Sequence, residues 1–231
     1  MHQQLKYRSA LGPALLLASL LLLTGCGPIN IRPEQTLPKP LLTPMASQIG
    51  VVMTGELRNY KHEETRSGTD WKIELGPGHV KLVEQMFAAS FKSSRVFKSL
   101  DEARVEAGLN VLFIPRIEQY SFATARDTSG GYYAVTIRYR IDVLTPAGEE
   151  ADSLTLTGYG SSLDKGGAGK SLERATVAAM RDAAAKFLVQ LPRQPRIVAL
   201  RNGEPLSPGL PATEVDEIET VPIEGSKLAA R

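Results

Sequence analysis

Apolar and polar side chains alternate strictly along residues 133–143, which is the clearest pattern in this 231-residue chain. The apolar set consists of Tyr133, Val135, Ile137, Tyr139, Ile141 and Val143. The positions between them hold Ala134, Thr136, Arg138, Arg140 and Asp142. Successive side chains of a strand point to opposite faces of a sheet, so this stretch predicts a strand with one buried and one solvated face. That pattern is typical of antiparallel sheets.

Five other segments have the composition of strands: residues 47–57, 70–75, 95–100, 109–125 and 152–162. Residues 58–69 are polar and are expected to form a loop or the tip of a hairpin, and residues 101–107 a helical turn. Pro115 lies near the middle of the strand expected at 109–125. Proline has no amide hydrogen to donate to a sheet, so this strand is expected to lie at an edge or to be bulged at that point.

Two segments have the three- and four-residue apolar spacing of amphipathic helices. In residues 79–93 the apolar positions are Val80, Val83, Phe87 and Phe91. In residues 170–191 they are Val177, Met180, Ala184, Phe187, Leu188 and Leu191, and Pro192 ends the helix. The element order predicts an α+β fold, a two-layer sandwich in which two helices pack on one face of a mostly antiparallel sheet.

Composition divides the chain into four parts. Residues 1–25 read as a signal peptide, because Lys6 and Arg8 precede a ten-residue apolar run that is too short to span a membrane. Residues 26–45 contain five prolines and predict an extended tether that could act as a spacer. Residues 46–192 form the domain, and the acidic, proline-containing residues 193–231 are expected to be disordered or to fold on contact with a partner.

The apolar run ends in Leu23, Thr24, Gly25 and Cys26, which resemble a bacterial lipobox. In that motif the two small residues fit the signal peptidase, and the cysteine thiol takes a diacylglyceryl group. The alternative reading is a cysteine in the core beside a buried helix, but positive charge, apolar run, small residues and cysteine occur in the order that lipidation needs. One acyl chain anchors only marginally, whereas the three chains usual for such lipoproteins would anchor the protein permanently. Cys26 is the only cysteine in the chain, so no intramolecular disulfide can form.

Charge argues against nucleic acid as a partner. The chain has 27 basic and 25 acidic residues, and removal of residues 1–25 takes away Lys6 and Arg8 and no acid. The mature chain therefore has 25 residues of each sign and lacks the basic surplus that phosphate backbones require.

The stretch KGGAGKS, residues 165–171, resembles the phosphate loop of partition and cell-division-site ATPases. Asp164 stands at the first-glycine position of the general motif, where a carboxylate would repel phosphate. No later apolar strand ends in an aspartate that could hold Mg²⁺, and the export signal directs the chain away from ATP. We therefore expect no nucleotide, but a strand-to-helix loop in which Ser171 or a neighbour caps the helix. A third reading is that Lys165 and Lys170 contact an anionic lipid or glycan.

Other candidate chemistry is sparse, so we expect no enzyme activity, no metal and no cofactor besides the covalent lipid on Cys26. His62 and His79 have no cysteine or second histidine at ligand spacing, and no GxSxG nucleophile motif occurs. Carboxylates such as Glu118, Asp142 and Asp164 are scattered along the sequence. Five aromatic residues could belong to the core or, on the solvated face, mark a binding surface: Trp71, Tyr120, Phe122, Tyr132 and Tyr133.

The LTGC motif, the proline-rich tether and the strand–helix–meander–helix order resemble small envelope lipoproteins. These include the auxiliary lipoproteins of ABC-type lipid transporters, the lipopolysaccharide-assembly lipoprotein and activators of penicillin-binding proteins, and the layout is similar to the N-terminal domain of the Tol translocation protein. The resemblance implies a non-catalytic binding or assembly subunit that docks on a larger envelope complex. Gly27 stands where Asp favours inner-membrane retention, which implies the periplasmic face of the outer membrane. Lipid or glycan binding in a cleft between sheet and helices is the alternative, and a periplasmic hydrolase is a third.

Overall fold

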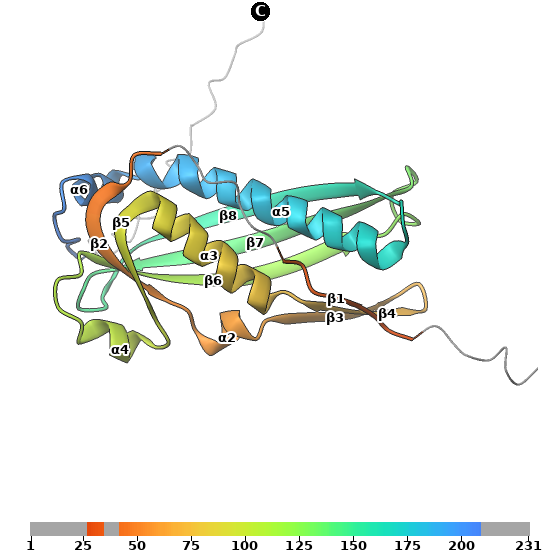
Figure 1. Ribbon diagram of the computed structural model, residues 1–231, viewed down its shortest axis with the longest axis horizontal. Coiled ribbons are helices and arrows are strands. Elements are labelled where there is room, and N and C mark those ends of the chain that lie inside the picture. The colour runs from red at the N-terminus through yellow and green to blue at the C-terminus, as the bar shows by residue number, and fades with distance from the viewer. Residues whose placement is uncertain (1–26, 35–41, 209–231) are drawn as a thin grey trace, which may run out of the picture.

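The computed structural model of the chain describes residues 27–34 and 42–208 and contains two sheets (Figure 1). The larger sheet has the strand order β5-β2-β6-β7-β8. Its strands are β5 Phe91–Phe97, β2 Met45–Val52, β6 Val111–Ala123, β7 Tyr132–Leu144 and β8 Glu150–Leu163. The smaller sheet has the order β1-β4-β3, with β1 Ile29–Ile31, β4 Thr69–Glu74 and β3 Lys61–Arg66.

Two long helices, α3 (Gly76–Ser90) and α5 (Ala168–Gln190), lie side by side on one face of the five-stranded sheet (Figure 1). Phe87 of α3 packs against Phe113 of β6 and Phe187 of α5, with ring centroids 4.9 and 5.0 Å apart. All three rings are fully buried, so this cluster joins both helices to the sheet and forms the centre of the core.

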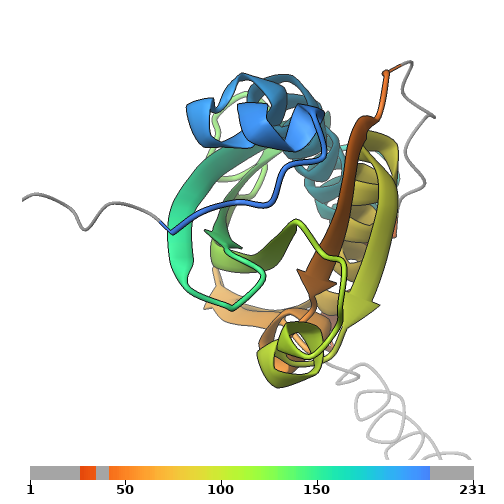
Figure 2. The ribbon, with the colours of Figure 1, turned by 90° about the vertical axis from the view of Figure 1, so that its left-hand side faces the viewer.

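The remaining helical segments are short. Thr54 caps α2 (Gly55–Arg58) and Ser99 caps α4 (Leu100–Arg104), each accepting a hydrogen bond from a backbone N–H of the first turn. After α5, two 3₁₀ turns at Leu191–Arg193 and Pro195–Ile197 lead into α6 (Val198–Arg201). Figure 2 looks along the molecule at the end that carries α4 and α6.

The predicted α+β class is confirmed, but the prediction of a mostly antiparallel sheet with two helices was wrong. Strand β2 pairs in parallel with both β5 and β6, and β1 pairs in parallel with β4. Only β3–β4, β6–β7 and β7–β8 are antiparallel, so both sheets are mixed. Parallel neighbours need a long crossover, and α3 lies in the crossover that leads from β2 to β5. The part of the chain that the structure describes contains five α-helices, three of them of four or five residues.

At Pro115, which has no amide hydrogen to donate, strand β6 is paired on one side only among the described strands. The pairing with β2 ends at Val51 and Phe113, so at Pro115 the only paired neighbour in the described chain is β7. The bulge of this strand comes slightly later, between Ile117 and Gln119. The extra residue there changes which side chains are buried, from Phe113 and Ile117 before it to Tyr120 after it.

The alternation along β7 is confirmed. Ile137 is fully buried and Arg138 is exposed, and the other apolar positions of this strand face the core in the same way. Helix α5 also forms as expected, except that Val177 and Leu188 are only partly buried. The helix predicted at residues 79–93 forms as α3 but ends at Ser90, so Phe91 belongs to β5 instead of the helix.

Parts of the segments predicted to be tether and tail belong to the folded domain. Residues 29–31 form β1, with Ile31 buried. Residues 193–208 pack on the domain through Ile197, Leu200 and Leu206, and the N–H of Leu206 donates to the carbonyl of Asn110 at 2.8 Å. The signal peptide, Cys26 and residues 209–231 lie outside the described residues, so the predictions for them stand as predictions.

Helix α5 lies directly on two glycines of β8. A Cβ atom at Gly158 would lie 2.2 Å from the carbonyl oxygen of Ala179, and one at Gly160 would lie 2.1 Å from that of Ala175. Both oxygens are backbone atoms of α5, so a side chain in either place would push the whole helix away from the sheet. Glycine is therefore required at both positions by contact rather than by backbone conformation.

We expect Gly158→Ala and Gly160→Ala each to lower the free energy of unfolding by about 1–3 kcal/mol through overpacking. The measurement is equilibrium urea unfolding of the mature domain. Ser161→Ala is the matched control on the same strand, because Ser161 is exposed and its substitution should stay within about 0.5 kcal/mol. Equal changes in the free energy of unfolding at the three positions would show that α5 can move away from β8 without cost.

Candidate functional site

The glycine-rich loop between β8 and α5 is organised around Ser171, whose side chain is fully buried. The N–H of Lys165 donates to Ser171 Oγ at 3.2 Å, and that hydroxyl lies 3.2 Å from the carbonyl of Lys165 and 3.5 Å from the carboxylate of Asp164. Gly166 and Gly167 have φ of +84° and +98°, in the region that favours glycine. The loop therefore folds back on the first turn of α5.

Arg174 fixes the same loop from the next turn of the helix. Its guanidinium donates to the hydroxyls of Ser162 and Ser171, at 3.0 Å each, and to the carbonyl of Lys165. A phosphate loop instead turns its backbone amides and its serine hydroxyl toward the ligand. Here the hydroxyl is used inside the loop, so the arrangement is that of a connection between strand and helix.

The expectation that Ser171 or a neighbouring side chain caps α5 was wrong. The residue at the N-cap is Gly167, which has no side chain to accept a hydrogen bond, and Ser171 lies within the first turn. The side chains of Lys165 and Lys170 are both exposed, Lys165 in the loop and Lys170 on the helix. The structure thus shows both lysines at the surface, and the predicted anion contact stays a prediction.

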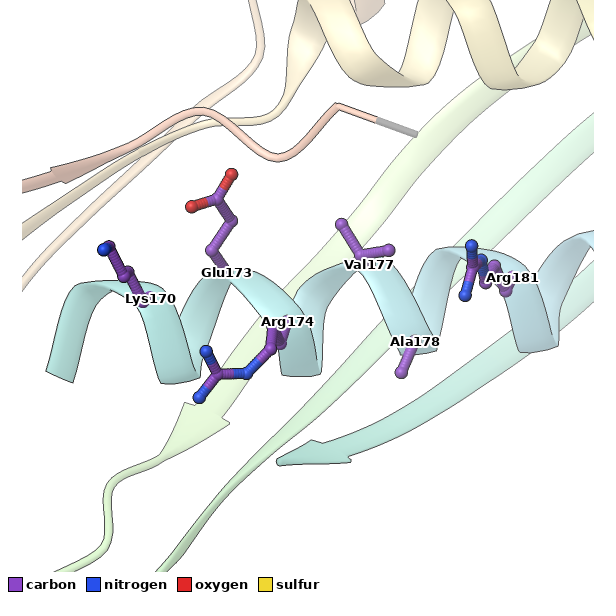
Figure 3. Close-up of a pocket in the computed structure, with 6 residues that line it drawn as sticks. All are labelled: Lys170, Glu173, Arg174, Val177, Ala178 and Arg181. Carbon is purple, nitrogen blue, oxygen red and sulfur yellow. The ribbon is translucent and has the colours of Figure 1, made fainter. Parts of the chain in front are cut away.

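A shallow hollow of about 720 Å³ lies over the outer surface of α5 (Figure 3). It is lined by Lys170, Glu173, Arg174, Val177, Ala178 and Arg181. Figure 3 shows Glu173 and Val177 pointing to one side of the helix and Arg174 to the other. A second hollow of about 340 Å³ is lined by residues around Met45, Ser90 and Arg201.

The face of β6, β7 and β8 that points away from α3 and α5 carries a network of arginines and carboxylates. Arg116 of β6 stands directly opposite Arg140 of β7, a like-charge pair that alone would be destabilising. Asp142 offsets this repulsion by pairing with both, with 2.6 Å between its Oδ1 and the Nε of Arg140. The hydrogen bond and the charge of Asp142 raise the pKa of Arg140 above its ordinary value.

Further along this face, Arg138 pairs with Glu118 at 3.3 Å and donates to Gln119 at 3.2 Å. The network thus brings together Glu118 and Asp142, two carboxylates that the sequence leaves scattered. We call this surface the open sheet face. Its outward side chains include Arg116, Gln119 and Ser121 of β6, Thr136, Arg138 and Arg140 of β7, and Thr155, Thr157 and Tyr159 of β8.

Large apolar side chains are exposed toward one end of the open sheet face. Tyr159 and Leu163 of β8 are 60 % and 56 % exposed, and Tyr132, opposite Leu163 on β7, is 38 % exposed. The other four aromatic residues considered from the sequence, Trp71, Tyr120, Phe122 and Tyr133, are buried. Trp71 packs on Phe122 at 5.3 Å between ring centroids, so these rings belong to the core that joins the two sheets.

Sequence reasoning missed the opposition of Arg116 and Arg140 and the exposure of Tyr159. The register that brings the arginines together depends on the bulge in β6, which pairing alone reveals. The signal for Tyr159 was present, because it lies one residue from Gly158 and Gly160 and therefore on the opposite face of the same strand.

The side chains whose pKa values are strongly shifted are buried and form hydrogen bonds within the core. His79 of α3 donates from Nδ1 to the carbonyl of Leu75 and accepts at Nε2 from the hydroxyl of Tyr139, both at 2.7 Å. Burial lowers the pKa of His79 to about 4 and raises the pKa of Tyr139. Burial likewise raises the pKa of Tyr120, whose hydroxyl lies 2.8 Å from that of Thr176 on α5. These hydrogen bonds join each long helix to the sheet.

The other histidine of the described residues, His62, lies beside Glu64, with 3.1 Å between Nε2 and Oε2. Within residues 27–34 and 42–208, no three His, Cys, Asp or Glu side chains cluster as metal ligands would. None of the helices in that part of the chain is both long and apolar enough to cross a membrane. The lipobox residues Leu23, Thr24, Gly25 and Cys26 lie outside it.

Comparison with known proteins gives matches among solved structures. No protein-family profile matches the chain, and no curated protein matches it significantly. Among solved structures, a Xanthomonas campestris protein of family DUF330 is similar at 11 % identity and a TM-score of 0.46, over 69 % of this chain and 92 % of the other. A Caulobacter crescentus CB15 protein described as a candidate lipoprotein is similar at 14 % identity and a TM-score of 0.29, over 39 % and 73 %.

We expect the His79–Tyr139 pair to make stability depend on pH. Above pH 6.5 the ring is neutral in both states, whereas between pH 6.5 and about 4 only the unfolded chain gains the proton. The free energy of unfolding should therefore fall by roughly 3 kcal/mol across that range on account of this group. Urea unfolding at pH 7 and pH 4.5 measures the fall, which should be correspondingly smaller in His79→Leu/Tyr139→Phe. Equal falls in the two proteins would contradict the assignment.

Proposed function

We propose that this chain is a lipoprotein of the bacterial envelope, anchored through Cys26 to the periplasmic face of the outer membrane, and that it acts as a non-catalytic binding or assembly subunit. The LTGC motif supports the anchor. The observation that carries the binding role is the open sheet face, where none of the helices in residues 27–34 and 42–208 covers the middle of β6, β7 and β8. A sheet face with exposed tyrosine and arginine side chains has the composition of a protein interface.

The arginine network suits a docking surface because it is ordered before binding. Asp142 is nearly buried and holds Arg116 and Arg140, whose side chains remain 43 % and 37 % exposed. The guanidinium groups are thereby fixed in position while part of each stays open to a partner carboxylate. A partner that binds here gives up little side-chain entropy from this protein.

Tyr159 extends the same surface at the edge of the sheet. Its backbone N–H donates to Asp182 of α5 at 2.8 Å, and the Nζ of Lys186 lies 4.7 Å from the centre of its ring. Lys186 also donates to the carbonyl of Thr157 at 2.7 Å. These contacts satisfy the edge of β8 near Tyr159, which favours side-chain recognition on the face over strand addition at that edge.

The alternative function is binding of a lipid or glycan. The hollow over α5 lies on the outer surface of that helix, whereas the second hollow is lined by residues from the start of β2 and from α3, α5 and α6. The hollow over α5 combines the cations Lys170, Arg174 and Arg181 with the apolar Val177 and Ala178. That combination suits an amphiphilic anion, with the charges at its head and the helix surface beneath its apolar part.

We expect Cys26→Ser to release the protein from the membrane fraction. The wild-type protein should incorporate labelled fatty acid and sediment with outer membranes, because its acyl chains bury many methylene groups. The variant should keep its signal peptide or appear as a soluble periplasmic protein without label. Unchanged labelling and sedimentation would exclude Cys26 as the anchor.

We expect a photo-cross-linking amino acid on the open sheet face to capture one envelope protein in cells of the native host. Thr136 and Thr155 are suitable positions, and Glu173 and Arg181 on α5 are the matched positions for the alternative. Arg138→Glu should abolish the adduct from Thr136, because it reverses a charge beside the probe. An adduct from the α5 positions alone, together with phospholipid or glycan retained in native mass spectrometry, would instead favour the alternative.

A further inference from the structure

We infer that the end of the molecule at which β1 begins rests against phospholipid headgroups, and that exposed side chains there contact the lipid. This inference rests on the proposed acylation of Cys26. Only Gly27 and Pro28 separate Cys26 from Ile29, the first residue of β1. Three residues span at most about 11 Å, so the start of β1 must lie within that distance of the acylated residue.

Strand β1 is packed firmly enough to transmit this restraint to the domain. It pairs with β4 through Ile29 and Trp71, Asn30 and Lys72, and Ile31 and Ile73. The segment therefore does not serve as a spacer over its first residues, which differs from the extended tether expected from its prolines.

Two further contacts hold the same segment against the helices. A Cβ atom at Gly169 of α5 would lie 3.1 Å from Cγ2 of Ile29. One at Gly78 of α3 would lie 2.0 Å from the carbonyl oxygen of Pro33, so this part of the chain lies directly on the helix backbone. The N-terminal segment is thus in contact with β4, α3 and α5 together.

Three loops share the end at which β1 begins (Figure 1). The β3–β4 turn lies close to the start of β1, because only residues 69 and 70 separate the turn from Trp71, which pairs with Ile29. Arg66 of that hairpin pairs with Asp127 of the β6–β7 loop at 3.3 Å. The N–H of Asp164, at the start of the β8–α5 loop, donates to the carbonyl of Gly131 at 2.9 Å. We call this region the anchor end, and α4 and α6 mark the opposite end (Figure 2).

The anchor end has side chains that suit a bilayer surface. Tyr132 and Leu163, paired across β7 and β8, are exposed there, and tyrosine is favoured where apolar and polar layers meet. Lys165, two residues after Leu163, and Lys170, near the start of α5, are exposed at the same end, and no ion pair found among the described residues includes either lysine.

Acidic residues at the anchor end do not cancel this arrangement. Asp127 is occupied, because it accepts hydrogen bonds from Thr124 and pairs with Arg66. Asp164 is exposed and carries one negative charge, which Lys165 and Lys170 outnumber. Exposed tyrosine, leucine and lysine together fit the interfacial layer of a phospholipid bilayer, where lysine reaches phosphate and the apolar side chains reach the upper acyl region.

The test uses the full acylated chain in phospholipid vesicles whose headgroups carry a nitroxide quencher. A fluorophore is attached at Asp164→Cys at the anchor end, or at Val105→Cys or Asn202→Cys at the opposite end, with Cys26 already blocked by lipid. We expect quenching at position 164 to be several-fold stronger than at 105 or 202. Equal quenching, or the reverse order, overturns the orientation. Mass spectrometry of the same samples separates the two proposals, because a chain without acyl groups overturns both and an acylated chain with equal quenching overturns only this one.

A spacer variant tests whether the surface itself binds lipid. Insertion of ten Gly and Ser residues between Gly27 and Pro28 removes the short connection while leaving acylation intact. We expect the label at 164 to remain more strongly quenched than the labels at 105 and 202. Quenching at 164 that falls to the level of the other two overturns the lipid contact.

Substitutions in the spacer background identify the residues responsible. Tyr132→Ser/Leu163→Ser/Lys165→Ser/Lys170→Ser should reduce quenching at 164 to the level of the opposite end. Val189→Ser/Val198→Ser is the matched control, because both valines are exposed on elements that lead to the opposite end. Circular dichroism checks that the variants remain folded. Loss of quenching in the control, or its persistence in the quadruple variant, overturns the assignment.

Discussion

The arrangement of this domain depends on the seating of helix α5 on the two glycines of β8. Because Gly158 and Gly160 have no side chains, the helix backbone reaches the strand, and its side chains Asp182 and Lys186 can bend around the edge to bind the backbone at Tyr159 and Thr157. One helix therefore covers a face of β8 and satisfies part of its edge. Among the described residues no helix covers the opposite face of β8, which is why the proposed binding surface is placed there.

The close contact of α5 with Gly158 and Gly160 also determines the conformation of the β8–α5 loop. With the start of α5 held close to the end of β8, the connection is short, and Ser171 and Arg174 are drawn into hydrogen bonds with its backbone. A loop in which these groups are occupied has little capacity to reorganise around a phosphate chain. The lysines remain exposed because no backbone group of the loop requires them. A sequence that resembles a phosphate loop thus folds here as a packed connection between strand and helix.

The sequence predicted the elements whose side chains meet solvent on one side and the core on the other. It predicted β7 and both long helices for that reason. It could not predict that β2 and β5 are parallel, because periodicity shows which side of a strand is buried but not the direction of its neighbour. Strand β3 was missed because its residues, KHEETR, are all polar, and it forms by pairing with β4 while His62 packs on Tyr120. The open sheet face was only partly visible, since Arg138 and Arg140 were assigned to the solvated side but their partners depend on register.

The anchor and the open sheet face can work together because of how the strands run. Strands β7 and β8 extend for 13 and 14 residues, which corresponds to about 45 Å at the usual rise per residue. They lead from the anchor end toward the end that carries α4 and α6. If the anchor end meets the bilayer, the open sheet face stands away from the membrane instead of lying on it, with Tyr132 and Leu163 at its base and the arginine network farther out. A single folded unit of this shape can hold lipid at one end and present an ordered protein-binding surface along its side.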